Sequence, residues 1–367
     1  MDNSELFPRD HIKTCYLGKN VNGYIDSSEF GDPLGKISHT DRLIQVLVKN
    51  YVDKGGTINF GESVSSVSKS IEKVEVKTNK GNTYVAKLLV LATGSRGFEI
   101  QSSLGFEIPD SYMGIYCHMF ESESQIESNF DFDYLFHINP NISENGPFFF
   151  NVGKGRVCTG YLGNKGESGS ELVNKLDRIL RNYKYIQPNL EGLKWDKSKF
   201  ITGKISKHPI SRFSQDRTLI LGEAAGLVTA FFYEGLLSGL ISAELASETI
   251  NPLLDKESSF SHTELANYDK ELKYKLLNKY YKNGEACEFI FYDASPSAIN
   301  KIWDTYTKLI QENKKLRKQI WEAYRKHDIE NYDLSRDKWA GERLFEKLPA
   351  LSKLSLGPKF LKALIKF

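Results

Sequence analysis

The sequence lacks a strong excess of charge, a metal-binding cysteine pattern and a long apolar run. Lys and Arg total 49 against 47 for Asp and Glu, so global charge does not indicate a nucleic-acid partner. The four cysteines lie far apart, and we interpret them as reduced thiols rather than metal ligands. No run of about 18 apolar residues is present, and the opening MDNSELFPRD lacks the apolar stretch of a signal peptide. These absences predict a cytoplasmic protein without a metal site.

A second absence concerns the glycine turn that binds dinucleotides. No Gly-x-Gly-x-x-Gly follows an apolar strand, and Gly18 and Gly23 are not preceded by one. This turn normally places a pyrophosphate on a helix N-terminus. A dinucleotide bound by this sequence would therefore lack its usual phosphate turn.

What is present is organised around residues 218–250. An apolar run at 218–221 predicts a buried strand, and it ends at Gly222-Glu223-Ala224-Ala225-Gly226. A helix is predicted from about Glu234, where apolar residues recur at helical spacing on one face: Leu236, Leu240, Ala243, Ala246 and Ile250. A strand, a turn of small residues and a helix N-terminus form a place where backbone N–H groups meet an anion. The alternative is a turn that only packs the helix closely on a sheet.

A second apolar run, at 88–92, ends at Thr93-Gly94. A continuous run of this kind is typical of a central parallel strand that is buried on both faces. We therefore predict that Leu89, Val90, Leu219, Ile220 and Leu221 are fully buried in adjacent parallel strands.

The 222–235 segment resembles the second flavin-binding motif of the FAD-dependent geranylgeranyl reductase family, whose parent class includes aromatic hydroxylases and flavin halogenases. Matching positions are Gly222, Ala224, Ala225, Gly226, Glu234 and Gly235. The segment departs from the motif where Glu223 replaces Asp, Ala230 replaces Pro, Tyr233 replaces Gly and Ala243 replaces Gly. Ala92-Thr93-Gly94 resembles the strand end that the family places near the FAD pyrophosphate.

The resemblance implies a flavin site. The carboxylate of Glu223 would bond the ribityl chain, and the helix beginning near Gly235 would direct its positive end at the edge of the flavin ring that becomes negative on reduction. The cofactor-binding residues implied are Ala92, Thr93, Gly94, Gly222, Glu223, Ala224, Gly226, Glu234 and Gly235. Proteins of this class begin with a strand–glycine turn–helix unit that this sequence lacks, so we expect FAD affinity to be severely reduced.

Residues 112–215 change to short strands and turns, with strands predicted at 112–120, 134–138, 147–152 and 156–161. The segment 146–163 resembles the family's substrate domain, in which an aromatic strand lines an isoprenoid channel. This implies substrate contacts by Phe148, Phe149, Phe150 and Tyr233, whereas three phenylalanines in one strand are also typical of a core.

After residue 250 the pattern is helical and charged. The stretch 347–367 contains five lysines and no acidic residue, interleaved with leucines. Such a helix either lies on an anionic bilayer, which would be the inner face of the membrane, or packs on the protein itself.

These observations predict an α/β fold with a partial three-layer, Rossmann-like FAD-binding domain, an antiparallel substrate-binding sheet and a helical C-terminus. The predicted domains are 1–110 with 205–255 for FAD, 111–204 for substrate and 256–367 for the helical region. The predicted function is that of an FAD-dependent oxidoreductase that reduces carbon–carbon double bonds of a prenyl lipid or similar apolar substrate. An external reductant such as NAD(P)H or ferredoxin would supply electrons.

Two alternatives stay open. A flavin monooxygenase would use the same cofactor with oxygen, and a flavin-less fragment would bind only a hydrophobic ligand or partner. No acid–base pair can be named, because the flavin itself carries the redox chemistry.

Overall fold

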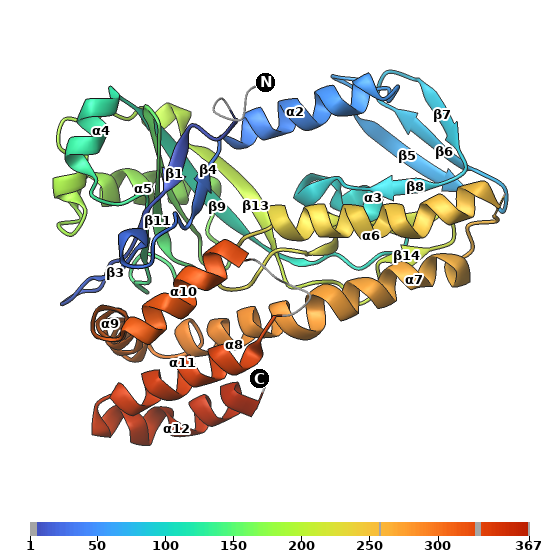
Figure 1. Ribbon diagram of the computed structural model, residues 1–367. Coiled ribbons are helices and arrows are strands. Elements are labelled where there is room, and N and C mark those ends of the chain that lie inside the picture. The colour runs from blue at the N-terminus through green and yellow to red at the C-terminus, as the bar shows by residue number, and fades with distance from the viewer. Residues whose placement is uncertain (1–5, 257, 327–331, 366–367) are drawn as a thin grey trace. The chain divides into compact units, whose positions relative to one another are not determined.

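The computed structural model describes residues 6–256, 258–326 and 332–365 (Figure 1). The chain divides into two compact units, one formed by residues 1–57, 113–203 and 286–367 and the other by residues 58–112 and 204–285. The sequence predicts one domain from residues 1–110 with 205–255. In the structure, residues 6–57 lie in the unit of the antiparallel sheet, because two of their strands extend that sheet.

The first unit is built on a seven-stranded sheet in the order β13-β9-β12-β11-β10-β2-β3, of which one end of β9 and one end of β13 belong to the second unit. Its strands are β2 (Lys13–Tyr16), β3 (Gly23–Asp26), β9 (Asp110–Phe120), β10 (Tyr134–His137), β11 (Phe148–Gly153), β12 (Arg156–Leu162) and β13 (Ile201–Lys207). All neighbouring pairs with a defined register are antiparallel except β10 and β2. The four strands predicted between 112 and 161 are confirmed.

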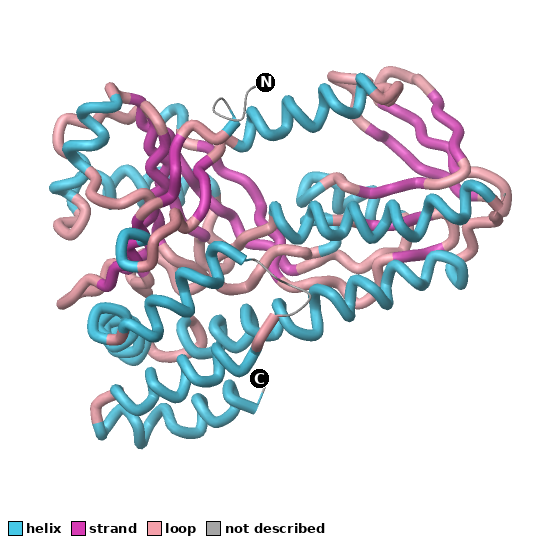
Figure 2. The backbone as a smooth tube through the Cα atoms, in the orientation of Figure 1, coloured by secondary structure: helices cyan, strands magenta, loops and turns pink. Residues whose placement is uncertain are grey.

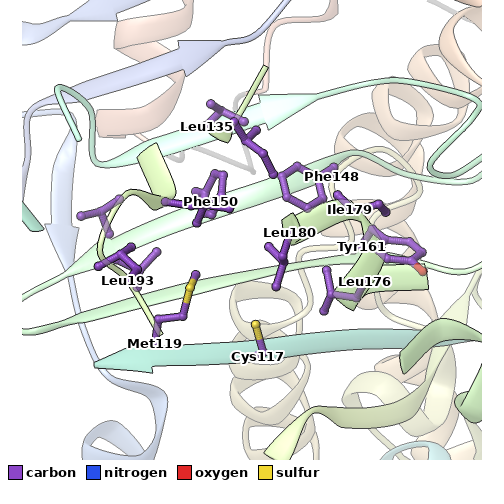
Figure 3. Close-up of a cluster of buried hydrophobic side chains, with 14 of the residues drawn as sticks. Cys117, Met119, Leu135, Phe148, Phe150, Tyr161, Leu176, Ile179, Leu180 and Leu193 are labelled. Atoms are coloured by element: carbon purple, nitrogen blue, oxygen red, sulfur yellow. The ribbon is translucent and has the colours of Figure 1, made fainter. Parts of the chain in front are cut away.

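One face of this sheet carries the hydrophobic core (Figure 3). Helix α5 (Gly169–Asn182) packs there through Leu172, Leu176 and Leu180, which are fully buried. The helix begins with a capping box in which Ser168 accepts from the Glu171 backbone and the Glu171 side chain accepts from the Ser168 backbone. Helix α4 (Glu123–Asn129) adds Ile126 to the same cluster.

The N-terminal segment and the C-terminal helices meet at strand β3. Helix α9 (Pro296–Glu312) packs so closely on β3 that a Cβ at Gly23 would lie 2.6 Å from the Thr307 carbonyl oxygen. Arg317 of helix α10 (Lys314–Lys326) forms a two-pronged ion pair with Glu29, at 2.6 and 2.7 Å. This geometry suits a planar guanidinium. These contacts explain why segments that are far apart in sequence form one unit.

The rest of the first unit consists of peripheral elements. Strands β1 (Arg9–His11) and β4 (Gly35–Ile37) pair with each other, and helix α2 (Thr40–Asp53) follows His39. None of the residues of α2 is buried. Helices α11 (Leu334–Lys347) and α12 (Ala350–Ile365) complete a C-terminal region that is almost entirely helical (Figure 2).

The second unit contains two three-stranded sheets. One sheet is antiparallel and consists of β5 (Val64–Lys69), β6 (Val74–Thr78) and β7 (Thr83–Ala86), which follow each other as hairpins. The other sheet has the order β14 (Ser214–Gln215), β15 (Thr218–Ile220) and β8 (Leu89–Leu91). The buried Arg217 joins the hairpin region to β8, because its guanidinium donates to the carbonyls of Ile71 and Lys87.

Helices cover part of this second unit. They are α3 (Phe98–Ser103), α6 (Leu236–Asp255) and α7 (His262–Leu272), and α7 continues through a π-helical segment, Lys273–Tyr281, into α8 (Lys282–Phe291). Helix α6 packs on α7, and α7 packs on β14. Tyr268 of α7 donates its hydroxyl hydrogen to the Ile220 carbonyl at 3.1 Å, which fixes the helix over β15.

Candidate flavin-binding site

The candidate site lies where the parallel strands β8 and β15 end side by side. Leu219 pairs with Val90 and Ile220 with Leu91, and the Leu221 N–H donates to the Leu91 carbonyl at 2.9 Å. Each strand leads directly into a 3-10 turn, η2 (Gly94–Gly97) after β8 and η5 (Gly222–Ala225) after β15, and the two turns pack on each other. The two glycine-containing segments singled out from the sequence therefore meet at one edge of one sheet.

Both turns need glycine at their first residue. Gly94 and Gly222 each have φ of +57°, a left-handed conformation that side chains disfavour. The Gly222 N–H donates to the Ser242 hydroxyl oxygen at 3.1 Å, and that hydroxyl donates to the Gly239 carbonyl at 2.7 Å. Ser242 of α6 thus fixes the start of η5.

Gly226 closes the η5 turn in the same left-handed region, with φ of +73°. A Cβ at this position would lie 2.1 Å from the His208 carbonyl oxygen. The predicted glycine is therefore needed for packing of the turn. Ala224 and Ala225 are completely buried, so their small side chains pack within the protein.

Glu223 directs its carboxylate towards the first turn. A Cβ at Gly94 would lie only 3.2 Å from Glu223 Oε2, and Oε1 accepts the Ser206 N–H at 3.1 Å. The Ser206 hydroxyl oxygen is buried and has no hydrogen-bond partner in the described part of the chain. A partly exposed carboxylate and a buried free hydroxyl next to two left-handed glycines form a polar pair that suits ligand hydroxyl groups.

Sequence reasoning missed Ser206 and Ser242. Ser206 lies near the end of β13, and Ser242 lies in the middle of the helix predicted from about Glu234. Neither position carries a local motif, so only the fold shows that both serve the turn at Gly222.

The N-terminus of α6 is the third part of the site. Gly235 occupies the N-cap position without a side-chain hydrogen bond, and the first turn contains no acidic residue. In this 20-residue helix the first backbone N–H groups therefore keep their capacity to bind an anion or a carbonyl oxygen. The side chain of Glu234 is held elsewhere, by the Tyr280 hydroxyl at 3.3 Å.

A short closed loop delivers the chain to this helix. The Thr229 N–H donates to the Glu234 carbonyl at 3.0 Å, and the Glu234 N–H donates to the Thr229 hydroxyl oxygen at 3.1 Å. Tyr233 inside the loop has φ of +58°. The structure therefore keeps a glycine-like backbone at the position where the resemblance implies glycine, although a tyrosine is present.

Two expectations about burial are wrong. Leu219, Ile220 and Leu221 are buried as predicted, but Leu89 is only partly buried and Val90 is 42% exposed. Strand β8 is the last strand of its sheet, so no neighbour on that side shields it within the described residues. Ala92 and Thr93, which follow it, are exposed.

The face of α6 that carries the apolar spacing is also less buried than its pattern suggests. Leu236 and Leu240 are 53% and 46% exposed, and Ala243 is exposed as well. The helix instead buries a face with several small polar residues, which includes Ser238, Ser242 and Thr249. Small hydroxyl side chains allow close approach to η5, whereas the predicted apolar face is only partly covered: Ala246 is buried, but Leu236, Leu240 and Ala243 are exposed.

The aromatic strand divides between the two faces of its sheet. Phe148 and Phe150 have no solvent exposure and pack in the core shown in Figure 3. Their complete burial makes them core residues, which corrects the implied substrate contact. Only Phe149 lies on the opposite face, because successive side chains of a strand alternate.

That opposite face is aromatic and partly exposed. Phe149 pairs in register with Phe136, and Tyr134 stacks on Phe136 with ring centroids 6.0 Å apart. Further along the same face, Tyr116 and Phe120 of β9 are 37% and 66% exposed. The face thus presents aromatic rings together with polar groups, which include the phenolic hydroxyls, the Asn151 amide and the His118 imidazole.

Comparisons with known proteins rest on structure, since the sequence matches no protein-family model and no curated protein. A geranylgeranyl bacteriochlorophyll reductase-like protein from Thermoplasma acidophilum superimposes with a TM-score of 0.74 and 17% identity, over 98% of this chain and 85% of that one. A p-nitrophenol 4-monooxygenase from Pseudomonas putida gives 0.61 and 14%, over 88% and 81%. A halogenase in complex with FAD gives 0.63 and 12%, over 97% and 79%.

These likenesses show the fold. The chain has the α/β fold of this reductase-like protein, of the monooxygenase and of flavin-dependent halogenases, which confirms the fold class predicted from the sequence.

Proposed function

We propose that this protein is a flavin-dependent oxidoreductase whose FAD binds at the junction of β8, η5 and α6. The observation that supports this most directly is the pair of left-handed glycines, Gly94 and Gly222, at the adjoining ends of two parallel strands. In open α/β sheets, ligands bind outside the carboxyl ends of the strands.

The residues present fit the ribityl chain and the ring edge of a flavin. Glu223 would accept hydrogen bonds from ribityl hydroxyls, and the unpartnered Ser206 hydroxyl would add a second polar contact. The uncapped N-terminus of α6 would stabilise negative charge at the ring edge. Bound FAD supplies hydride transfer, so the protein's task is to bind, orient and tune it.

The phosphate part of the site is incomplete in this sequence. No Gly-x-Gly-x-x-Gly is present. Among the described residues β8 is the last strand of its sheet, and Leu236 and Leu240 of α6, in the same unit, are 53% and 46% exposed. We propose that a further strand–turn–helix segment covers these surfaces and holds the pyrophosphate. The chain alone is then expected to purify colourless, which an absorbance spectrum checks.

For the reaction, we propose reduction of a carbon–carbon double bond in a prenyl lipid or a similar apolar substrate. Support comes from the aromatic face formed by Tyr134, Phe136 and Phe149 and from the likeness to a geranylgeranyl bacteriochlorophyll reductase-like protein. An external donor such as NAD(P)H or ferredoxin would supply the electrons.

Oxygenation is the second candidate, because the monooxygenase and halogenases named above share the fold. One experiment distinguishes reduction of the substrate from its oxygenation. The chain is loaded with excess FAD, reduced chemically without oxygen, and mixed with geranylgeraniol while the return of oxidised flavin absorbance is followed. Reoxidation without oxygen supports the reductase, whereas product formation that requires oxygen supports the monooxygenase. If no flavin binds under any condition, the protein is a flavin-less hydrophobic binder and the proposal is wrong.

A further inference from the structure

Helix α12 carries two apolar stripes, one buried against the protein and one exposed to solvent. Leu351, Leu354 and Leu361 are 83%, 79% and 63% exposed. Together with Ser355 and Pro358, which are also exposed, they follow the three- and four-residue spacing of one helix face. Exposed leucines in such a row are unusual on a protein surface and indicate a binding face.

The helix is nevertheless firmly docked through its other side. Leu356, Phe360 and Ala363 are buried there, and the Phe360 ring lies 5.3 Å from the ring of Phe345 in α11. Docking therefore explains one stripe only. The sequence left two roles open for this helix, packing on the protein and contact with an anionic bilayer. The buried stripe packs on the protein, whereas the exposed stripe can contact a partner.

The charges around the exposed stripe favour an anionic partner. All 47 acidic residues of the protein precede Lys347, whereas five of its 49 basic residues lie from Lys347 onward. Lys362 is exposed beside Leu361, and Lys353 is partly exposed between Leu351 and Leu354. Two other lysines are engaged: Lys359 lies 3.8 Å from Asp293 and Lys347 lies 4.0 Å from Glu312. The stripe thus combines leucines with cations and has no acidic residue of its own.

We propose that this stripe lies on a bilayer of anionic phospholipid, with the leucines in the acyl boundary and Lys353 and Lys362 at the headgroups. No helix among the described residues is long and apolar enough to cross a membrane, so the contact is interfacial. A second copy of the chain would bring lysines against lysines without a carboxylate between them. An anionic bilayer suits both parts of the stripe, because its acyl chains accept the leucines and its headgroups attract the lysines.

The test uses the full chain and sedimentation with two kinds of vesicle, phosphatidylcholine alone and phosphatidylcholine mixed with phosphatidylglycerol. Binding is expected to the mixed vesicles and to weaken as salt is added, because exposed charges are screened. Replacing Leu351, Leu354 and Leu361 together by Gln is expected to weaken binding at least roughly tenfold. Lys353→Gln with Lys362→Gln is expected to weaken binding only to the anionic vesicles.

A matched control is Ile71→Gln, which alters an 87% exposed apolar residue of the second unit and is expected to leave binding unchanged. Circular dichroism verifies that each variant is folded. Failure of the wild-type chain to sediment with anionic vesicles, or equal binding by the triple Gln variant, would overturn the proposal. A wild-type dimer that the triple variant converts to a monomer would assign the stripe to a second copy instead. The result does not depend on flavin binding.

Discussion

At the scale of single residues, the site is defined by backbone conformation more than by side-chain chemistry. Gly94, Gly222 and Gly226 all have positive φ, and Tyr233 has the same conformation without being glycine. A left-handed conformation costs a side-chain-bearing residue about 1–2 kcal/mol. Tyr233 therefore carries a local cost at the entry to α6.

This cost predicts an inverted preference between alanine and glycine. The free energy of unfolding should be about 1 kcal/mol higher for Tyr233→Gly than for Tyr233→Ala. Both substitutions remove the ring, but only glycine suits the left-handed backbone. The same pair at the exposed helical residue Ser247 serves as control, where alanine should be favoured by about 1 kcal/mol. Urea denaturation measures all four variants. A Tyr233→Ala variant as stable as Tyr233→Gly would contradict the assigned backbone.

Residues with a local motif were predictable, and residues that depend on the fold were not. The glycines of 222–226 and Gly94 could be located because small residues directly after an apolar run indicate a turn. Ser206 could not, since its role arises from a hydrogen bond to a residue 17 positions away. The two core phenylalanines were misassigned because a strand alternates its faces and the sequence does not say which face the core occupies.

At the scale of elements, the two strands of the site differ in how much they contribute to stability. Leu221 directly follows β15 and is 7% exposed, whereas Val90 of β8 is 42% exposed. Leu221→Ala should lower the free energy of unfolding by about 2–5 kcal/mol through the cavity it leaves. Val90→Ala should cost less than about 1 kcal/mol, because its side chain is already partly in water. Thermal or urea unfolding compares the two variants. Equal losses in the free energy of unfolding would show that the Val90 side chain is buried, which would contradict the exposed position of β8.

Strand β10 carries a buried histidine that predicts a pH dependence. His137 is held between the Leu17 carbonyl and the Tyr183 hydroxyl, each at 2.6 Å, and desolvation by burial lowers its pKa to about 4. The unfolded chain, in which this pKa is near 6.5, then binds more protons than the folded chain between pH 6.5 and 4. Stability should therefore be complete above pH 6.5 and fall as the pH drops to 4, by roughly 3 kcal/mol for this residue.

The measurement is urea unfolding at several pH values for the wild type and His137→Gln. The variant should start less stable at neutral pH and lose less on acidification. Part of the dependence should remain, because burial also lowers the pKa of His11 to about 4. Parallel pH profiles for the two proteins would show that His137 does not contribute.

Elements with strong periodicity were predicted well, and their partners were not. The bounds of the four strands between 112 and 161 follow from alternation and turn residues. The face that α6 buries does not, because its close approach to η5 selects Ser238 and Ser242 over the leucines. Periodicity identifies an apolar face, but it does not show whether this chain covers it.

At the scale of the whole molecule, the chain enters each compact unit more than once. The sequence indicated the class of fold, since a strand–turn–helix motif and an antiparallel segment follow each other. It did not indicate that residues 1–57 join the antiparallel sheet, because the parallel pairing of β2 with β10 connects residues about 120 positions apart. Contacts of that separation leave no local pattern.

The central claim is that the turns after β8 and β15, with α6, form a flavin site that is incomplete in this chain. The most direct measurement is a titration of the purified protein with FAD, followed by flavin fluorescence, for the wild type, Glu223→Ala and the control Glu244→Ala on the exposed side of α6. We predict weak but saturable binding by the wild type, no change in Glu244→Ala and a roughly tenfold weaker affinity in Glu223→Ala, because a hydrogen bond to a charged group is lost. Equal affinity in all three proteins, or no saturable binding by the wild type, would contradict the account.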